Sequence, residues 1–253
     1  MPTYDDAQFL AEALLSIHAQ TARSAQVLVV DDGSASDAAA QIVDRVNAAT
    51  GLAAEYVRIE HAGLAAARNA GLARATQPYV AFLDADDRWM PGHVALKLGR
   101  LAVRDERYST AYDSYLNCDL EGRPLWTMPS GSHDGPIDGR LMGTRDGIPA
   151  GAPFHLHRRA ALEAVGGFDE GLAMGEDFDL LLRLAQAGRW VVGSGRPTVW
   201  RRLRRDSLTT RDVERTLAEI GRFHDKAERE GLLTPPVLRS MRRGLRLELA
   251  RNL

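Results

Sequence analysis

Two short apolar runs, each ending in a cluster of acids, constrain the fold of this chain most. Residues 26–30 are QVLVV and precede Asp31 and Asp32, whereas residues 79–83 are YVAFL and precede three aspartates within residues 84–87. A short run without polar interruption is typical of a strand that is covered on both faces. Helical patterns lie between the runs, and this alternation predicts an α/β fold with a parallel sheet covered by helices.

The remaining predicted elements extend this alternation through the first half of the chain and add helices in the second half. We expect helices over residues 7–19, 36–46, 64–75, 158–165, 177–187, 211–230 and 236–249, another from Pro91, and a third strand over 55–59. Strands joined by a turn at Glu121 and Gly122 are predicted within 112–126, and a loop over 130–151. Where the alternation stops, we place a boundary between a domain of residues 1–205 and a helical extension of residues 206–253.

Charge and cysteine content narrow the possible partners and compartments. The net charge of -2 gives no indication of nucleic-acid binding. The single cysteine, Cys118, cannot form an internal disulfide, which favours a reducing compartment. No leader pattern begins the sequence, and no apolar stretch approaches the roughly 20 residues of a membrane helix. We therefore expect a cytoplasmic protein that at most touches a membrane surface.

The acids after the second run indicate a cation site. Asp84, Asp86 and Asp87 repel one another unless a cation lies among them. They follow a buried strand directly, and ligands of such sheets bind beyond the carboxyl ends of the strands. Mg²⁺ and Mn²⁺ prefer oxygen ligands and usually share their coordination shell with substrate phosphates. The alternative is a solvated acidic turn in which Asp87 caps the next helix.

The acids after the first run, Asp31 and Asp32, are followed by Gly33 and Ser34. An acid at such a strand end can accept hydrogen bonds from a ribose or a base, and Gly33 permits a tight turn. Asp-Gly is also common in ordinary turns. The segment lacks the GxGxxG pattern of dinucleotide-binding folds, which argues against a nicotinamide-dependent enzyme.

Two further segments place charged side chains on predicted helices. Arg68 is a lone cation on an alanine-rich helix, where it could pair with a diphosphate or with the acids of the strand ends, or form a structural salt bridge. Glu176 and Asp177 stand at a predicted helix start, whose positive end favours ionised carboxylates. Such a carboxylate can accept a proton from an attacking hydroxyl, although acids are also common there as simple caps.

Together, these segments resemble the family-2 glycosyltransferases, which are inverting enzymes with the A-type glycosyltransferase fold. The matching stretches, all within residues 2–188, are PTYDDAQFLAEALLSIHAQT, VLVVDDGS, GLAAARNAGL, YVAFLDADDRW and RRAALEAVGGFDEGLAMGEDFDLLLRLAQAG. The resemblance implies a Rossmann-like, mostly parallel sheet flanked by helices. It also implies transfer of a sugar from a nucleotide-diphosphate donor to a hydroxyl of a glycan, lipid-linked or other acceptor, assisted by Mn²⁺ or Mg²⁺.

The resemblance also implies roles for individual residues. Asp177 would be the catalytic base, Asp86 the direct metal ligand, and Asp84 a second ligand. The residues expected to bind the nucleotide sugar are Pro2, Thr3, Tyr4, Asp32, Arg68, Asp84 and Asp86. Those expected on the acceptor side are Gly167, Phe168 and Glu176.

Two positions differ from the family pattern. Met1 stands where relatives usually carry an apolar, central strand, whose absence would forfeit several buried side chains at roughly 1.5–3 kcal/mol each. Leu203 stands where many relatives carry a histidine, and the neighbouring arginines could hold the diphosphate instead. An impaired relative that binds a nucleotide sugar without transferring it, or an interaction module, is therefore the alternative function. The basic, amphipathic tail over residues 236–253 is expected either to touch an anionic membrane or to pack on the domain.

Overall fold

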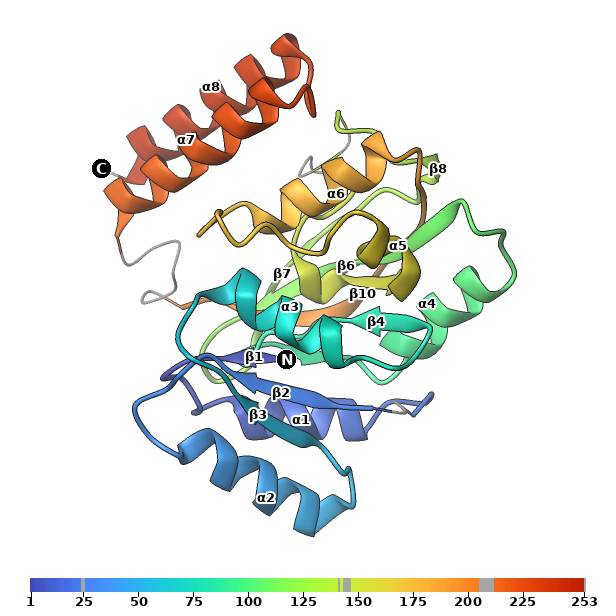
Figure 1. Cartoon of the computed structure of the whole chain (residues 1–253), viewed down its shortest axis with the longest axis vertical. Helices are drawn as coiled ribbons and strands as arrows, with labels where there is room; N and C mark the ends of the chain where they lie inside the picture. The colour runs from blue at the N-terminus through green and yellow to red at the C-terminus, as the bar shows by residue number, and fades with distance from the viewer. Residues whose placement is uncertain (24–25, 141, 143–146, 205–211, 253) are drawn as a thin grey trace.

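The computed structural model describes residues 1–23, 26–140, 142, 147–204 and 212–252 of the chain. Two β-sheets and the helices packed against them form an α/β architecture (Figure 1). This confirms the fold class that the alternation of strands and helices predicts. The proposed domain boundary at residues 205 and 206 lies outside the described residues.

The first sheet is parallel and has the strand order β1-β2-β3. Its strands are β1 (Pro2–Thr3), β2 (Leu28–Asp31) and β3 (Glu55–Arg58). Helices α1 (Leu10–His18) and α2 (Ala38–Thr50) lie on one side, and α3 (Leu64–Arg74) lies on the other (Figure 1). Residues of β2 are therefore covered on both faces, which is why this strand is almost wholly apolar.

The second sheet has the order β4-β9-β6-β10-β5, with β7 added to β6 and β8 added to β10. Its long neighbours β6 and β10 are parallel, whereas the other ladders of this sheet are antiparallel. The strands are β4 (Tyr79–Ala81), β5 (Arg88–Trp89), β6 (Tyr108–Cys118), β7 (Pro124–Met128), β8 (Asp134–Pro136), β9 (His155–Arg158) and β10 (Trp190–Arg202). The sequence patterns predict β4 and the β6–β7 pair, but not β5, β8, β9 or β10.

The remaining helices flank this sheet or form the C-terminal extension. They are α4 (His93–Ala102), the 3₁₀ turn η1 (Ala152–Phe154), α5 (Arg159–Ala164), α6 (Glu176–Gln186), α7 (Val213–Arg229) and α8 (Pro235–Asn252). Leu238 of α8 is buried in the main hydrophobic cluster, and Arg242 pairs with Asp225 and Glu228 of α7. The start of the tail thus packs on the rest of the chain. Among the described residues, no helix combines the length and the apolar character needed to cross a membrane.

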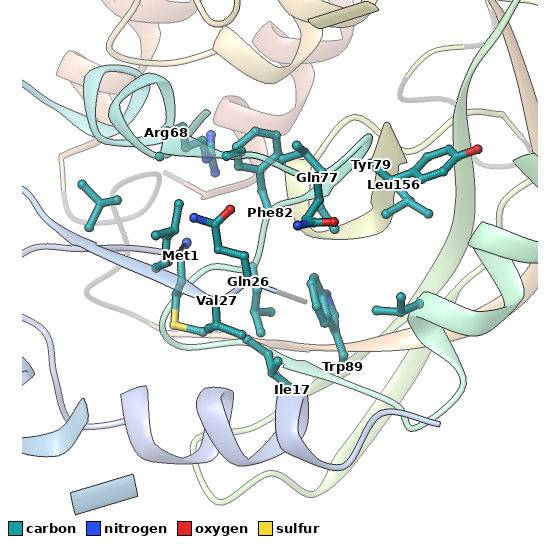
Figure 2. Close-up of a pocket in the computed structure, with 18 of the residues that line it drawn as sticks. Met1, Ile17, Gln26, Val27, Arg68, Gln77, Tyr79, Phe82, Trp89 and Leu156 are labelled. Carbon is teal, nitrogen blue, oxygen red and sulfur yellow. Dashed lines mark hydrogen bonds between the residues drawn. The ribbon is translucent and has the colours of Figure 1, made fainter. Parts of the chain in front are cut away.

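A cavity of about 420 Å³ lies between the two sheets (Figure 2). Val27 and Leu28 line one wall, Val80 and its neighbours in β4 line another, and side chains of α1, α3 and α4 complete it. Met1 also lines the cavity, and the short strand β1 that follows it pairs Pro2 with Val30 and Thr3 with Asp31. Burial lowers the pKa of the Met1 amino group, which donates to Leu28 O at 2.8 Å, to about 5. Met1, which precedes Pro2, therefore borders an apolar space that both sheets enclose.

Filling this cavity should stabilise the protein. We expect an extension of four apolar residues, Val-Ile-Val-Ile, ahead of Met1 to raise the Tm by more than about 5 °C relative to Gly-Ser-Gly-Ser. Side chains placed between the two helical layers are buried on both faces, each contributing about 1.5–3 kcal/mol, and 1 kcal/mol corresponds to roughly 2–4 °C in a chain of this size. Thermal unfolding of the two monomeric proteins measures the difference, and equal Tm values would contradict the expectation.

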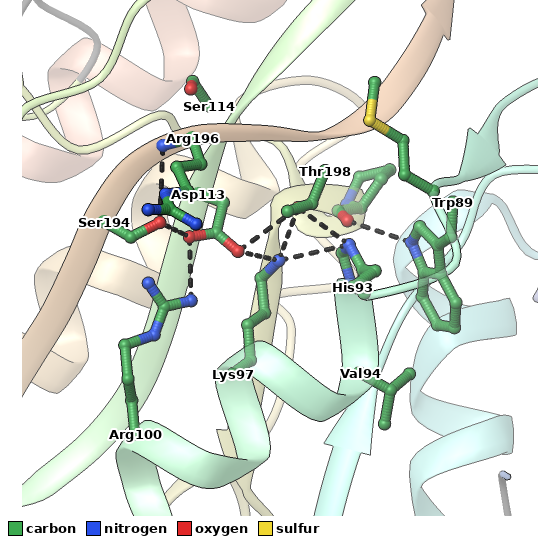
Figure 3. A network of polar contacts seen from close by, with 12 residues as sticks. Trp89, His93, Val94, Lys97, Arg100, Asp113, Ser114, Ser194, Arg196 and Thr198 are labelled. Carbon is green, nitrogen blue, oxygen red and sulfur yellow. Dashed lines mark hydrogen bonds and ion pairs between the residues drawn. The ribbon is translucent and has the colours of Figure 1, made fainter. Parts of the chain in front are cut away.

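A buried polar network fixes α4 to the second sheet (Figure 3). Lys97 Nζ donates to Asp113 Oδ2 at 2.8 Å and to Thr198 Oγ1 at 2.9 Å, and it lies 3.1 Å from His93 Nδ1. Arg100 donates to the other oxygen of Asp113 at 2.7 Å. The side chains of Lys97 and Asp113 are fully buried. The network therefore joins α4, β6 and β10 at one point.

Candidate active site

Arg68 gathers three carboxylates from distant parts of the chain. Its Nη1 donates to Glu176 Oε1 at 2.6 Å and to Asp177 Oδ1 at 2.9 Å, and its Nη2 donates to Asp84 Oδ1 at 2.9 Å. The guanidinium is almost fully buried. Its pKa is raised, because the attraction of the three carboxylates outweighs the opposing effect of burial. The structure thus brings together four residues that the sequence singles out.

Local sequence explains how these side chains meet. Small residues let α3 lie close to β2: a Cβ on Gly71 would lie 3.5 Å from Val30, an ordinary contact distance. Gly175, with a φ of 83°, precedes Glu176 and lets α6 begin abruptly. The positive end of α6 lies at Glu176 and Asp177 and favours their ionised forms.

Opposing effects act on the pKa of Asp177. Its pKa is raised to about 8 by burial and by the charges of Glu176 and Asp84, while Arg68 acts in the opposite direction. The second carboxylate oxygen accepts a hydrogen bond from Ala152 N at 3.1 Å. A carboxyl group whose pKa lies near neutrality can both take up and release a proton during a reaction.

The three acids after β4 have different environments. The side chain of Asp86 is partly exposed, and burial together with the charge of Asp84 raises its pKa to about 6. Asp87 is buried and accepts a hydrogen bond from Arg202 N at 2.9 Å, so it anchors the end of β10. Arg204 Nη1 lies 3.7 Å from Asp86 Oδ2. Asp84 and Asp86 are therefore the two acids available to a ligand.

On the opposite side of the site, an aromatic pair lies above the end of β2. The rings of Tyr4 and His61 stack at 4.2 Å, and Tyr4 is 47% exposed. Asp32 is buried, with its carboxylate accepting from Ala62 N at 2.8 Å and Gly63 N at 2.9 Å. His61 Nδ1 also lies 2.9 Å from this carboxylate. Asp32 thus holds the turn that presents His61, a residue that sequence reasoning missed because no motif marks it.

Other predicted residues lie at the edges of this arrangement. Pro2 and Thr3 form β1 beside β2, ahead of Tyr4. Gly167 has a φ of 69°, and a Cβ there would lie 2.5 Å from Asn69 Oδ1, so another residue would not fit. Phe168 is buried, with its ring 5.0 Å from that of Phe82 and 5.3 Å from the Arg68 guanidinium. The buried Phe168 ring therefore packs against the Arg68 guanidinium.

Arginines at the end of β10 form contacts that the sequence analysis did not anticipate. Arg202 donates from Nε to Asp86 O at 3.0 Å and from Nη2 to Glu12 at 2.9 Å, and it stacks 3.9 Å from Phe9. Arg204 pairs with Asp6. Both arginines fix the loops after β1 and β4. The sequence alone does not predict that Arg202 and Arg204 fix these loops, because it does not predict β10.

The donor set is suited to a hard divalent ion that shares its shell with a substrate. Within the described residues, no group of three His, Cys, Asp or Glu side chains is arranged to hold a metal. Asp84 and Asp86 supply two carboxylates. Burial and, to a smaller extent, the charge of Asp84 raise the pKa of Asp86, and a cation between the two acids would offset their repulsion. Mg²⁺ is usually bound by one or two carboxylates with substrate phosphates and water. The residues present fit such an ion.

Comparison with known sequences identifies a family. Residues 1–165 match the family described as Glycosyl transferase family 2. The pre-mycofactocin glycosyltransferase of Mycobacterium tuberculosis is 35% identical over 182 residues, covering 66% of this chain and 35% of that protein. The succinoglycan biosynthesis protein ExoU of Rhizobium meliloti is 33% identical over 200 residues, covering 74% of this chain and 56% of that protein. The chain thus spans less than two thirds of the length of these relatives.

A solved structure supports the same fold. The mannosyltransferase PcManGT from Pyrobaculum calidifontis, determined with GDP-Man and Mn²⁺, superposes with a TM-score of 0.68 at 21% identity. The match covers 95% of this chain and 67% of that one. The likeness therefore extends beyond the segment matched by the family and includes the second half of the chain.

Proposed function

The chain belongs to glycosyltransferase family 2, and from this premise we propose that it transfers a sugar from a nucleotide-diphosphate donor to an acceptor hydroxyl with inversion at the anomeric carbon. The convergence of Asp84, Glu176 and Asp177 on Arg68 carries the proposal. Through Arg68, it links Asp84, an acid of the proposed cation site, to a carboxylate able to act as a base. These are the two groups that a single displacement at a sugar carbon requires.

The nucleotide is proposed to lie against the ends of β1 and β2. The exposed ring of Tyr4, stacked on His61, offers a flat surface for a base, and Pro2 and Thr3 border it. Asp32 contributes by holding the turn that carries His61. Arg68 contributes through the carboxylates that it neutralises and orients, since its terminal nitrogens already contact them.

Asp86, with Asp84, is proposed to hold a divalent ion, Mn²⁺ or Mg²⁺, against the donor diphosphate. When bound, such an ion neutralises charge on the leaving group. Asp177 accepts the proton of the acceptor hydroxyl as that oxygen attacks the anomeric carbon. Ala152 N and Arg68 hold its two oxygens in place. One displacement without a covalent intermediate inverts the configuration, so the reaction requires no nucleophilic side chain.

The acceptor is proposed to be a hydroxyl of a glycan or a lipid-linked saccharide. Relatives named for succinoglycan biosynthesis and for pre-mycofactocin glycosylation support this class. Gly167, Phe168 and Glu176 are proposed to border the acceptor side of Asp177, with the Phe168 ring packed against Arg68. A peripheral membrane contact through the basic tail would suit a lipid-linked acceptor.

Release of nucleoside diphosphate tests the proposed function. UDP-, GDP- and TDP-sugars are incubated with the protein, with and without Mn²⁺, and ligand binding is followed in parallel by the rise in Tm. Metal-dependent release from one donor class is the expected result. A donor that raises the Tm without any turnover, with saccharide acceptors present, would instead support the alternative of an impaired nucleotide-sugar-binding relative.

Separate substitutions of Asp86 and Asp87 should have different effects. We expect Asp86→Ala to weaken donor binding in Mn²⁺ by at least 10-fold with little change in Tm, because Asp86 is partly exposed and available to a ligand. Asp87→Ala should lower the Tm, because it removes the acceptor of Arg202 N. Calorimetric titration and thermal unfolding of both variants measure this contrast. Wild-type donor affinity in the Asp86 variant would rule out its metal role.

A further inference from the structure

The C-terminal extension contacts the helix that carries the proposed base. Gly175, the N-cap of α6, lies directly beneath α7, where a Cβ on Gly175 would be only 2.9 Å from Phe223 Cγ. Phe223 is buried, and its ring lies 6.0 Å from that of Phe178. The residues on both sides of Glu176 and Asp177 are therefore packed against α7.

A charged network makes the same connection one turn later. Lys226 Nζ of α7 donates to Asp179 Oδ1 at 2.5 Å and lies 2.6 Å from Asp169 Oδ2. Asp179 is fully buried, and its other oxygen accepts from Arg183 Nε at 2.7 Å. Arg183 in turn donates to Gly167 O at 2.7 Å. Lys226 thus joins α7 to α6 and to the loop that precedes it.

The preceding loop is also tied to α3. Asn69 Nδ2 donates to Phe168 O at 2.9 Å, and Asn69 Oδ1 accepts from Phe168 N at 2.8 Å. Asn69 follows Arg68, whose guanidinium holds Asp177. The first turn of α6 is therefore held from two directions, by α3 through Arg68 and by α7 through Phe223 and Lys226.

We propose that the helical extension positions the catalytic base: Phe223 and Lys226 of α7 fix the first turn of α6 and thereby hold Asp177 in place for proton transfer. This inference rests on the proposed function. Displacement of a reacting group by about 1 Å can cost roughly 100-fold in rate, and a site requires supporting contacts to hold its geometry. Phe223 and Lys226 are positioning residues, because they act through Gly175 and Asp179.

The test compares Lys226→Met with Lys226→Arg and with Arg229→Ala, a control at an exposed position of the same helix. We expect Lys226→Met to lower kcat roughly 10- to 100-fold while donor affinity stays within about threefold, since Tyr4 and Asp86 lie on other elements. Lys226→Arg should recover most of the activity, because it restores the cation. Arg229→Ala should behave as the wild type.

Hydrogen exchange provides a measurement that does not depend on activity. Amides of residues 176–180 should exchange at least 10-fold faster in Lys226→Met than in the wild type, with those of β2 unchanged. If Lys226→Met does not fold, Phe223→Leu, which keeps an apolar side chain of similar size, replaces it in both measurements. Unchanged exchange in these amides would overturn the inference whether or not the protein transfers sugar. Wild-type kcat in a folded variant, with Asp177→Asn inactive, would overturn it while leaving the proposed function intact.

Discussion

Replacement of Asp177 by Asn is expected to lower kcat by roughly 10²- to 10⁴-fold, the range that general-base catalysis usually contributes. The amide has almost the same size as the carboxyl group, and its oxygen can still accept a hydrogen bond from Arg68. Its NH2 group then faces Ala152 N and loses that hydrogen bond, and the amide cannot take up a proton. Donor affinity should therefore remain within about threefold of the wild type. Initial rates of nucleoside diphosphate release and calorimetric donor titration measure the two quantities separately.

The matched control for Asp177→Asn is Glu176→Gln. Glu176 also accepts from Arg68, at 2.6 Å, so this substitution removes a neighbouring charge and keeps the base. Its effect on kcat should be clearly smaller. In the wild type, kcat/KM should fall as the pH is lowered below about 8, where the buried Asp177 becomes protonated. An Asn variant with wild-type turnover would exclude Asp177 as the base.

The first half of the fold follows from local sequence, whereas β10 does not. Apolar runs such as QVLVV predict β2 directly, since a strand buried on both faces has no polar positions. In β10, Gly193, Gly195 and Pro197 interrupt any strand pattern. Pairing with β6, β5 and β8 makes this segment a strand. Such tertiary pairing is not encoded in the local pattern.

The sequence singles out residues that the fold brings together, but it does not give the geometry in which they meet. The resemblance to family 2 singles out Arg68, Asp84 and Asp177, yet Arg68 and Asp177 are 109 positions apart, and only the fold brings them to 2.9 Å. The sequence leaves open whether Arg68 pairs with a diphosphate or with acids, and in the structure its terminal nitrogens contact carboxylates. The resemblance implies that Asp32 binds the base or ribose, and the structure adds that the backbone amides of Ala62 and Gly63 donate to its carboxylate. Hydrogen-bond competition of this kind cannot be deduced from residue type.

The largest loss of stability is expected from Asp113→Ala, which should reduce the free energy of unfolding by about 3–5 kcal/mol, the usual effect of removing one partner of a buried ion pair. Asp113 accepts from Lys97 at 2.8 Å and from Arg100 at 2.7 Å, and the variant leaves the Lys97 ammonium buried without this carboxylate. Urea unfolding at pH 7 measures the loss. Asp105→Ala, at an exposed acid paired with Arg107, is the control and should cost less than about 1 kcal/mol.

The pH dependence of this loss tests its cause. Burial lowers the pKa of Lys97 to about 8 although Asp113 opposes the shift, so removal of Asp113 should lower it further. The unfolded chain keeps the Lys97 proton up to about pH 10.4, and stability rises with pH wherever the unfolded state binds more protons. Between pH 7 and 8 the rise in stability applies fully to the variant and only weakly to the wild type, so the difference in stability between them should narrow by up to about 1 kcal/mol.

A double variant, Lys97→Met with Asp113→Leu, distinguishes two causes of the stability loss, an unpaired buried charge and lost packing. It removes the fully buried Lys97 ammonium together with Asp113 and should be more stable than Asp113→Ala alone. Only Arg100, whose side chain is 18% exposed, then lacks its carboxylate partner. If the double variant is no more stable, or if the deficit of Asp113→Ala is the same at pH 7 and 8, the loss arises from packing instead. The network also affects the candidate active site through β10. This strand carries Thr198, which belongs to the network, and Arg202, which contacts Asp86 and Asp87. A chain that loses the Lys97–Asp113 pair should therefore also bind donor more weakly, although neither residue lies in the site.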